Sequence, residues 1–235
     1  MAHELNALGQ PVGVPVAGWA PPRWPPLEPM AGRLCRLEPL SASRHAAELY
    51  AANGLDTEGR NWTYLPYGPF KTIEQYASWM TTETAGSDPQ LWAIVDALNG
   101  GATGLAAYLR IDPSSGSIEV GHINYSPLLQ RRPAATEAMY LMMRRAFELG
   151  YRRYEWKYDA LNAPSRAAAE RLGFSYEGLF RQARVNKGRN RDTAWYAVID
   201  RDWPSLREMF EQWLAPANFD ERGQQRRPLR GFRAR

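Results

Sequence analysis

Three short apolar segments in the first half of the chain are separated by strong turn signals. They are residues 91–96, 104–111 and 117–125, and the last of them, SIEVGHINY, alternates between apolar and polar side chains. Such alternation is typical of a strand with one buried face. The connections at 99–101 and 112–116 are rich in Asn, Asp, Ser, Pro and Gly, which favour tight turns. The pattern predicts an antiparallel meander of three strands.

Two helices are expected before this meander, after a short strand at residues 33–37. The first lies near 43–53 with Ser41 as its cap. The second lies at 72–82, where apolar side chains recur on one stripe. The intervening loop, residues 56–67, is rich in aromatic groups.

The second half of the chain alternates helical and strand patterns. Helices are predicted at 136–148, 165–172 and 204–214, and strands at 154–159, near 180–186 and at 193–200. Gly150 follows the first of these helices and Pro164 lies in the first turn of the second, as helix ends and starts prefer. This order predicts an α+β fold, a mixed sheet with helices on both faces.

A basic loop, Gln130–Arg132, joins the strand at 117–125 to the next helix. No acidic residue occurs from this loop through Thr136, so the positive end of the helix dipole and its free N–H groups remain available to a phosphate. The glycine patterns GxGxxG and GxxxxGK[ST] are absent from the sequence, which argues against dinucleotide and P-loop sites.

The loop resembles the acyl-CoA pyrophosphate loop of the GNAT N-acetyltransferases, (Gln/Arg)-x-x-Gly-x-(Gly/Ala), often followed by Thr-Glu-Ala. Gln130, Ala135 and the Thr-Glu-Ala run at 136–138 match this pattern, whereas Pro133 replaces its central glycine. A second motif follows at the expected distance. Asn-Ala-Pro-Ser at 162–165 precedes a helix that ends in Arg-Leu-Gly-Phe at 171–174, which resembles the second half of the GNAT core.

Smaller features narrow the resemblance. The segments at 62–70 and 187–192 are similar to those of the ribosomal-protein N-terminal alanine acetyltransferases, and the likeness spans residues 33–214. It implies the GNAT fold, with a twisted central sheet splayed in the middle. It also implies acetyl-CoA or another short acyl-CoA as cosubstrate, and no metal.

In the resembling fold, the acyl-pantetheine lies between the two splayed strands, and a backbone N–H stabilises the oxyanion. The residues that would contact the cosubstrate are therefore Ile123, Tyr125, Gln130, Arg131, Arg132, Ala134, Ala135, Thr136, Asn162 and Ser165. Asn162 and Ser165 could instead cap the helix that follows them.

Acyl transfer to an amine requires a neutral amine and a thiolate that leaves. Glu119 is the first candidate for the base, and His122 and Asp159 are its alternatives; a solvent-facing Glu119 would have no such role. The tyrosine that usually serves as the acid is replaced by Ala169, so Ser165 is the candidate acid.

Acceptor contacts are expected from the aromatic loop. The candidates are Trp62, Tyr64, Tyr67 and His122, with Asn61 and Phe70 beside them, and Arg181, Arg189 and Asp192 as further residues that could shape the pocket. Core packing is the alternative role for the aromatic side chains.

Composition limits the remaining possibilities. A length of 235 residues suits one domain. The single cysteine, Cys35, excludes a disulfide framework, and the three scattered histidines argue against a His-rich metal site. Apolar runs are shorter than the roughly 18 residues that a membrane helix needs, so a cytoplasmic protein is expected.

Charge and proline content divide the chain into three parts. Residues 1–32 form a proline-rich arm that would pack against the domain or a second subunit in a homodimer, and 33–215 form the acyltransferase domain. Residues 216–235 hold six arginines and two acidic residues, which leaves 23 basic and 23 acidic groups elsewhere. This basic segment is predicted to be disordered, and nucleic acid is expected as a partner only through it.

The sequence thus predicts an acyl-CoA-dependent N-acyltransferase. It would move an acetyl or short acyl group to a primary amine of a small molecule or a protein N-terminus, by direct transfer in a ternary complex. Pro133 and Ala169 leave open a catalytically degenerate CoA-binding protein, and the arginine-rich segment leaves open an RNA-associated protein.

Overall fold

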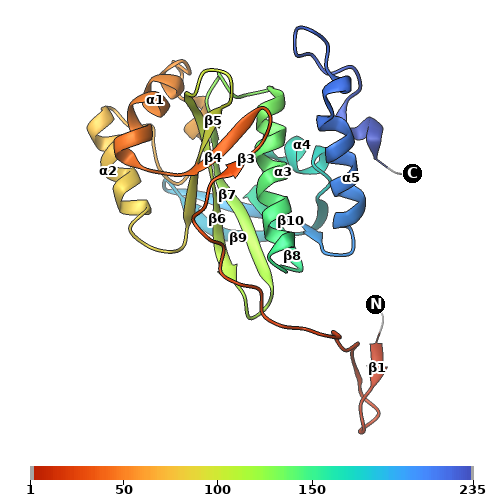
Figure 1. Ribbon diagram of the computed structural model, residues 1–235. Coiled ribbons are helices and arrows are strands. Elements are labelled where there is room, and N and C mark those ends of the chain that lie inside the picture. Colours follow the sequence, from red (N-terminus) through yellow and green to blue (C-terminus); the bar gives the residue numbers. More distant parts are fainter. Residues whose placement is uncertain (1–2, 234–235) are drawn as a thin grey trace.

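An eight-stranded mixed sheet forms the centre of the computed structural model, which describes residues 3–233 (Figure 1). Its strands lie in the order β3-β4-β5-β6-β7-β8-β10-β9. Their bounds are β3 Met30–Ala31, β4 Cys35–Pro39, β5 Gln90–Asp96, β6 Ala102–Asp112, β7 Ser117–Tyr125, β8 Arg153–Asp159, β9 Ser175–Asn186 and β10 Arg189–Ile199. Neighbouring strands are antiparallel except β7 and β8, which are parallel.

Helices cover both faces of this sheet, as the sequence predicts. On one face lie α1 (Ala42–Gly54) and α2 (Ile73–Glu83); on the other lie α3 (Pro133–Glu148), α4 (Ala163–Arg171) and α5 (Trp203–Leu214) (Figure 1). Successive residues of β5 point to opposite faces. Trp92 and Ile94 accordingly join the core beneath α3, whereas Leu91, Ala93 and Val95 join the core beneath α1 and α2. The predicted α+β class and the three-stranded meander are confirmed.

Element ends differ from the predictions by a few residues. α3 begins at Pro133, three residues before the predicted start, because a proline fits the first helical position without losing an intrahelical bond. β10 begins at Arg189, earlier than expected, because Lys187 and Gly188 alone form the turn. Their φ values of +48° and +73° are those of a two-residue hairpin turn.

The central sheet separates between β7 and β8. These strands pair in register from Ser117 opposite Arg153 to Val120 opposite Trp156, and there the pairing ends. β7 continues beside β6, and β8 continues beside β10. A bulge in the β6–β7 ladder, at which His122 has a φ of +49°, accompanies the divergence. The expected splay is thus present at the middle of the sheet.

The N-terminal arm is extended, but it carries structure that its prolines did not indicate. A hairpin of β1 (His3–Leu5) and β2 (Pro11–Gly13) projects away from the body (Figure 1). Farther along, the Pro25 carbonyl accepts a hydrogen bond from Gln90, and the arm ends as edge strand β3. A contact of the arm with a second subunit stays a prediction.

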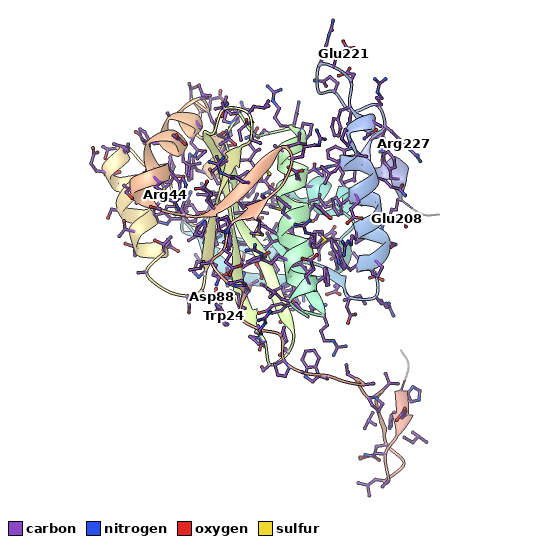
Figure 2. All side chains as sticks on the ribbon, in the orientation of Figure 1. Trp24, Arg44, Asp88, Glu208, Glu221 and Arg227 are labelled. Atoms are coloured by element: carbon purple, nitrogen blue, oxygen red, sulfur yellow. The ribbon has the colours of Figure 1, made fainter. Side chains whose placement is uncertain are left out.

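The predicted disorder of residues 216–235 is wrong for residues 216–233. Short 3-10 helices occur at Pro216–Asn218 and Leu229–Phe232, and Leu229 is only 2% exposed. Arg227 and its neighbours lie beside α5, and a loop through Glu221 extends beyond it (Figure 2). A few apolar side chains among the arginines, such as Leu229, pack against the domain. The average composition of the segment, on which the prediction of disorder depends, does not reveal them. Residues 234–235 lie outside the described part, and RNA binding stays a prediction.

Among residues 3–233, no helix is long and apolar enough to cross a membrane.

Helix α3 is fixed to the sheet edge through Glu137. One carboxylate oxygen accepts a hydrogen bond from the Arg33 N–H at 2.9 Å, and the other accepts from Leu34 at 2.6 Å and Cys35 at 2.9 Å. A Cβ at Gly32 would lie 2.5 Å from this carboxyl group, so the turn requires glycine there. The N-terminal half of α3 therefore holds the β3–β4 turn in place.

Replacing Glu137 with alanine should destabilise the fold. Three backbone N–H groups would lose their acceptor at a buried or partly buried site, and each such loss costs about 1–3 kcal/mol. We expect the free energy of unfolding, measured with urea, to fall by about 3 kcal/mol or more. Glu148→Ala, at the exposed end of the same helix, is the control and should change it by under about 0.5 kcal/mol. Equal losses in the two variants would contradict this role.

Candidate functional site

A cavity of about 490 Å³ opens where β7 and β8 diverge. It is lined by both strands, β6 at Leu109 and Arg110, the loop before α3, the start of α4, part of the loop at 60–66 and the β9–β10 hairpin. Among the residues expected at the site, those that line it are Asn61, Tyr64, Glu119, His122, Ile123, Tyr125, Gln130, Asn162 and Ser165. Asp159, an alternative base, lines it too. The splay therefore brings residues from distant parts of the sequence to one place.

Only Gln130 of the basic loop lines this cavity; Arg131, Arg132 and residues 134–136, also expected to contact the cosubstrate, do not. The Gln130 side-chain amide donates to the Tyr125 carbonyl at 2.8 Å and to Asn61 Oδ1 at 2.7 Å, which ties the loop to the end of β7. Arg131 and Arg132 are exposed, and the first turn of α3 contains no acidic residue. Pro133 occupies a position whose N–H would have no intrahelical partner in any case. The Ala135 N–H already donates to the Arg132 carbonyl at 3.1 Å. What the helix start offers an anion is therefore mainly positive charge.

The next residues of the motif face inward. The side chains of Ala134, Ala135 and Thr136 are buried, so only their backbone can face a ligand. Thr136 Oγ1 accepts a hydrogen bond from Arg171 Nη1 at 3.0 Å. The Thr-Glu-Ala and Arg-Leu-Gly-Phe motifs thus contact each other.

Glu119 is buried, which contradicts a solvent-facing position. Its carboxylate accepts two hydrogen bonds of 2.7 Å from Arg110 and lies 3.0 Å from Lys157 Nζ. Lys157 also lies 2.6 Å from Glu155, which stands opposite Glu119 in the β7–β8 register, and packs over the Trp195 ring. Each oxygen of Glu119 already has a cationic partner. Arg110 and Lys157 were not among the residues expected at the site. Lys157 stands between two carboxylates only through the β7–β8 register, which the sequence pattern does not reveal.

His122 lies beside the aromatic loop. Its Nδ1 is 3.3 Å from the Tyr67 hydroxyl, and the two rings stack with centroids 5.5 Å apart. Burial, and to a smaller extent the nearby Arg110, lower the pKa of His122 to about 4. The imidazole is therefore neutral at pH 7, so it can accept a hydrogen bond but binds a proton weakly.

Asn162 and Ser165 perform the helix-capping role and also line the cavity. Asn162 Oδ1 accepts the Ser165 N–H at 3.1 Å, which caps α4. The Ser165 hydroxyl accepts a hydrogen bond from Trp156 Nε1 at 2.9 Å, so its own hydrogen remains available to another acceptor. Ala169, at the position of the missing tyrosine, is completely buried.

The aromatic loop divides into lining and packing residues. Tyr64 lines the cavity and donates to the Leu161 carbonyl at 3.2 Å. Trp62 and Tyr67 do not line it; they pack with Phe70 of the loop and with aromatic rings of α2. The structure thus gives Trp62 and Tyr67 a packing role where the sequence predicts substrate contact, because large rings in this loop gain more from burial against each other.

The β9–β10 hairpin contributes arginines other than those expected. Arg181 and Arg189 are exposed and do not line the cavity, whereas Arg184 and Arg191 do. Asp192 accepts hydrogen bonds from the Gln182 N–H and the Asn190 side chain, which is a structural role at a bulge. The two-residue turn could have revealed the lining pair, because it places residue 184 opposite residue 191.

The arrangement suits an elongated thioester cosubstrate. The edges of β7 beyond Val120 and β8 beyond Trp156 are unpaired toward each other, and a free edge can bind an extended chain that carries amides, such as pantetheine. The basic start of α3 follows Gln130, which lines the cavity, and a helix start of this kind can bind phosphate. Within residues 3–233, no group of three or more His, Cys, Asp or Glu side chains is placed to hold a metal ion. Fold and site together define a CoA-dependent acyltransferase.

Comparison with known proteins agrees with this class. The model of the acetyltransferase (GNAT) domain matches residues 34–175. A GCN5-related N-acetyltransferase from Brucella melitensis has 46% identity and a TM-score of 0.90, over 93% of this chain and 99% of that one. A probable acetyltransferase of the GNAT family from Chromobacterium violaceum ATCC 12472 has 40% identity and a TM-score of 0.78, over 83% and 98%. The chain belongs to the GNAT family and is a GNAT-type N-acetyltransferase.

The branch within the family is less defined. A Vibrio cholerae protein provisionally designated a ribosomal-protein-serine acetyltransferase has 17% identity and a TM-score of 0.61, over 73% of this chain and 97% of that one. Such a likeness shows the fold alone. Comparison with curated proteins gave no match. The ribosomal-protein branch therefore stays a prediction.

Proposed function

We propose that this protein transfers an acetyl or other short acyl group from CoA directly to a primary amine, while both substrates are bound. The amine would belong to a small molecule or to a protein N-terminus. One observation carries this proposal: a single cavity is lined by Gln130, Asn162 and Ser165, expected to contact CoA, and by Tyr64 and His122, expected to contact the acceptor. Two substrates in one cavity need no covalent enzyme intermediate.

Steady-state kinetics test this function. Acetyl-CoA consumption should depend on an added primary amine, and double-reciprocal plots with both substrates varied should intersect, as a ternary complex requires. Parallel lines would indicate a covalent intermediate and contradict direct transfer. Tight acetyl-CoA binding without turnover across a broad panel of amines and N-terminal peptides would favour the catalytically degenerate alternative.

The start of α3 and its basic loop would hold the pyrophosphate of acetyl-CoA. Arg131 and Arg132 would supply charge, together with the positive end of the α3 dipole. The free edge of β7 at Ile123 and Tyr125 would orient the pantetheine arm. Bound acetyl-CoA supplies an acyl group that is activated as a thioester.

Replacing Arg131 and Arg132 together with alanine should weaken acetyl-CoA binding at least tenfold, which is about 1.4 kcal/mol. Loss of charge-assisted contacts to the phosphates is the reason. Isothermal calorimetry measures the effect. The double variant Arg222→Ala/Arg226→Ala removes the same charge from the C-terminal segment and should bind like the wild type. Unchanged affinity in the loop variant would place the phosphates elsewhere.

Glu119 remains the first candidate to accept the amine proton, and Asp159 is the alternative carboxylate of the cavity. Oε2 of Glu119 contacts both Arg110 and Lys157, whereas Oε1 contacts only Arg110 and retains a lone pair that could accept the amine proton. Ser165 would donate its hydroxyl hydrogen toward the leaving thiolate. This hydrogen is available because the Ser165 oxygen only accepts a hydrogen bond, from Trp156 Nε1.

Glu119→Gln should lower turnover by about 10²-fold or more, as loss of a general base does, and leave acetyl-CoA affinity nearly unchanged. Glu155→Gln is a matched control, because Glu155 shares Lys157 with Glu119 but does not line the cavity. Rates from pH 6 to 9 separate the roles. A similar loss in both variants, with the pH profile of the wild type, would mean that Glu119 only positions Lys157.

A further inference from the structure

Basic side chains outnumber acidic ones along the cavity. The basic lining residues are Arg60, Arg110, Lys157, Arg184 and Arg191, and the acidic ones are Glu119 and Asp159. Glu119 is already engaged by two of these cations. The part of the wall formed by the β9–β10 hairpin therefore carries positive charge that the protein does not neutralise locally.

Arg184 and Arg191 stand directly opposite each other on β9 and β10. Like charges in this position destabilise a sheet. In the described part of the chain, no ion pair joins either guanidinium to a carboxylate. The tight turn at Lys187–Gly188 sets this register, and Lys187 Nζ donates to the Trp62 carbonyl at 2.8 Å, which fixes the hairpin to the loop across the cavity. The register thus places the two arginines side by side, Arg191 half-buried and Arg184 exposed.

Arg191 also has an unsatisfied donor. Its Nε is buried and has no hydrogen-bond partner, although the side chain lines the cavity. Burial lowers the pKa of Arg191, and Asp159 offsets this only in part. A buried donor without a partner is unfavourable, and a guanidinium is suited to bind a carboxylate or phosphate through two parallel hydrogen bonds.

We infer that Arg184 and Arg191 bind an anionic group of the acceptor, so that the preferred substrate is an amine that also bears a carboxylate or phosphate. This inference rests on the proposed acyl transfer. The cosubstrate phosphates are a poor match for the pair, because the basic loop follows β7, whereas both arginines come from strands on the β8 side of the split. The anion would offset the repulsion between the arginines and place the amine toward the divergence of β7 and β8.

Matched amines test the inference. β-Alanine is compared with β-alanine amide, and phosphoethanolamine with ethanolamine, so that carboxylate and phosphate are tested separately. The wild type should show a kcat/KM at least tenfold higher for the anionic member of at least one pair. Equal values within both pairs would overturn the inference and leave the proposed function intact.

Variants assign the preference to the arginines. Arg191→Gln should lower kcat/KM at least tenfold for the preferred anionic amine, mainly by raising KM. For the neutral amine of the same pair, kcat/KM should change less than twofold. The affinity for acetyl-CoA should also change less than twofold. Arg189→Gln, on the same hairpin but outside the cavity, should behave like the wild type. Equal losses for both members of the pair would contradict anion binding. Melting temperatures should not fall, since the substitution removes a repulsion.

A binding measurement separates this inference from the proposed function. If no amine of either charge is acetylated, acyl transfer to such amines fails. Calorimetry with the same four compounds and CoA then decides the inference alone. Binding of an anionic member that is lost in Arg191→Gln would uphold it, and absence of such binding in the wild type would overturn it.

Discussion

The divergence of β7 and β8 is the constraint on which the rest of the site depends. Parallel pairing stops after Val120 and Trp156, and each strand continues beside a different neighbour. Two strand edges are thereby left unpaired inside the molecule, which is unfavourable unless water or a ligand satisfies them. The same divergence opens the cavity and exposes the loop that starts α3. The proposed meeting of cosubstrate and acceptor therefore depends on this divergence.

Charged groups at the root of the divergence hold its shape. Glu119 and Glu155 face each other across the last paired segment, and Lys157 bridges them while Arg110 engages Glu119 from β6. Truncating one member of such a buried network would leave an uncompensated charge. The network therefore has a structural role as well as the catalytic role proposed for Glu119. Comparing variants at Glu119 and at Glu155, which both contact Lys157, separates the two roles.

Contacts between motifs keep α3 in position. Thr136 meets Arg171 of α4, and Glu137 holds the β3–β4 turn at the sheet edge. Residues of the motif that would interact with cosubstrate through their backbone thus use their side chains for packing. The proline at 133 is compatible with this arrangement, because the helix start loses no intrahelical bond there.

Strand alternation, turn residues and the two spaced motifs were enough to predict the α+β fold, the family and the basic loop, because each depends on residues that are near neighbours in the sequence. The tertiary structure alone decided which side chains share a wall. Trp62 and Tyr67 pack together, and the C-terminal arginine-rich segment folds onto α5 through residues such as Leu229. Strand register brings Arg110 and Lys157 into contact with Glu119, and it places Arg191 opposite Arg184. Burial and register arise from pairing between distant segments, so local pattern does not determine them.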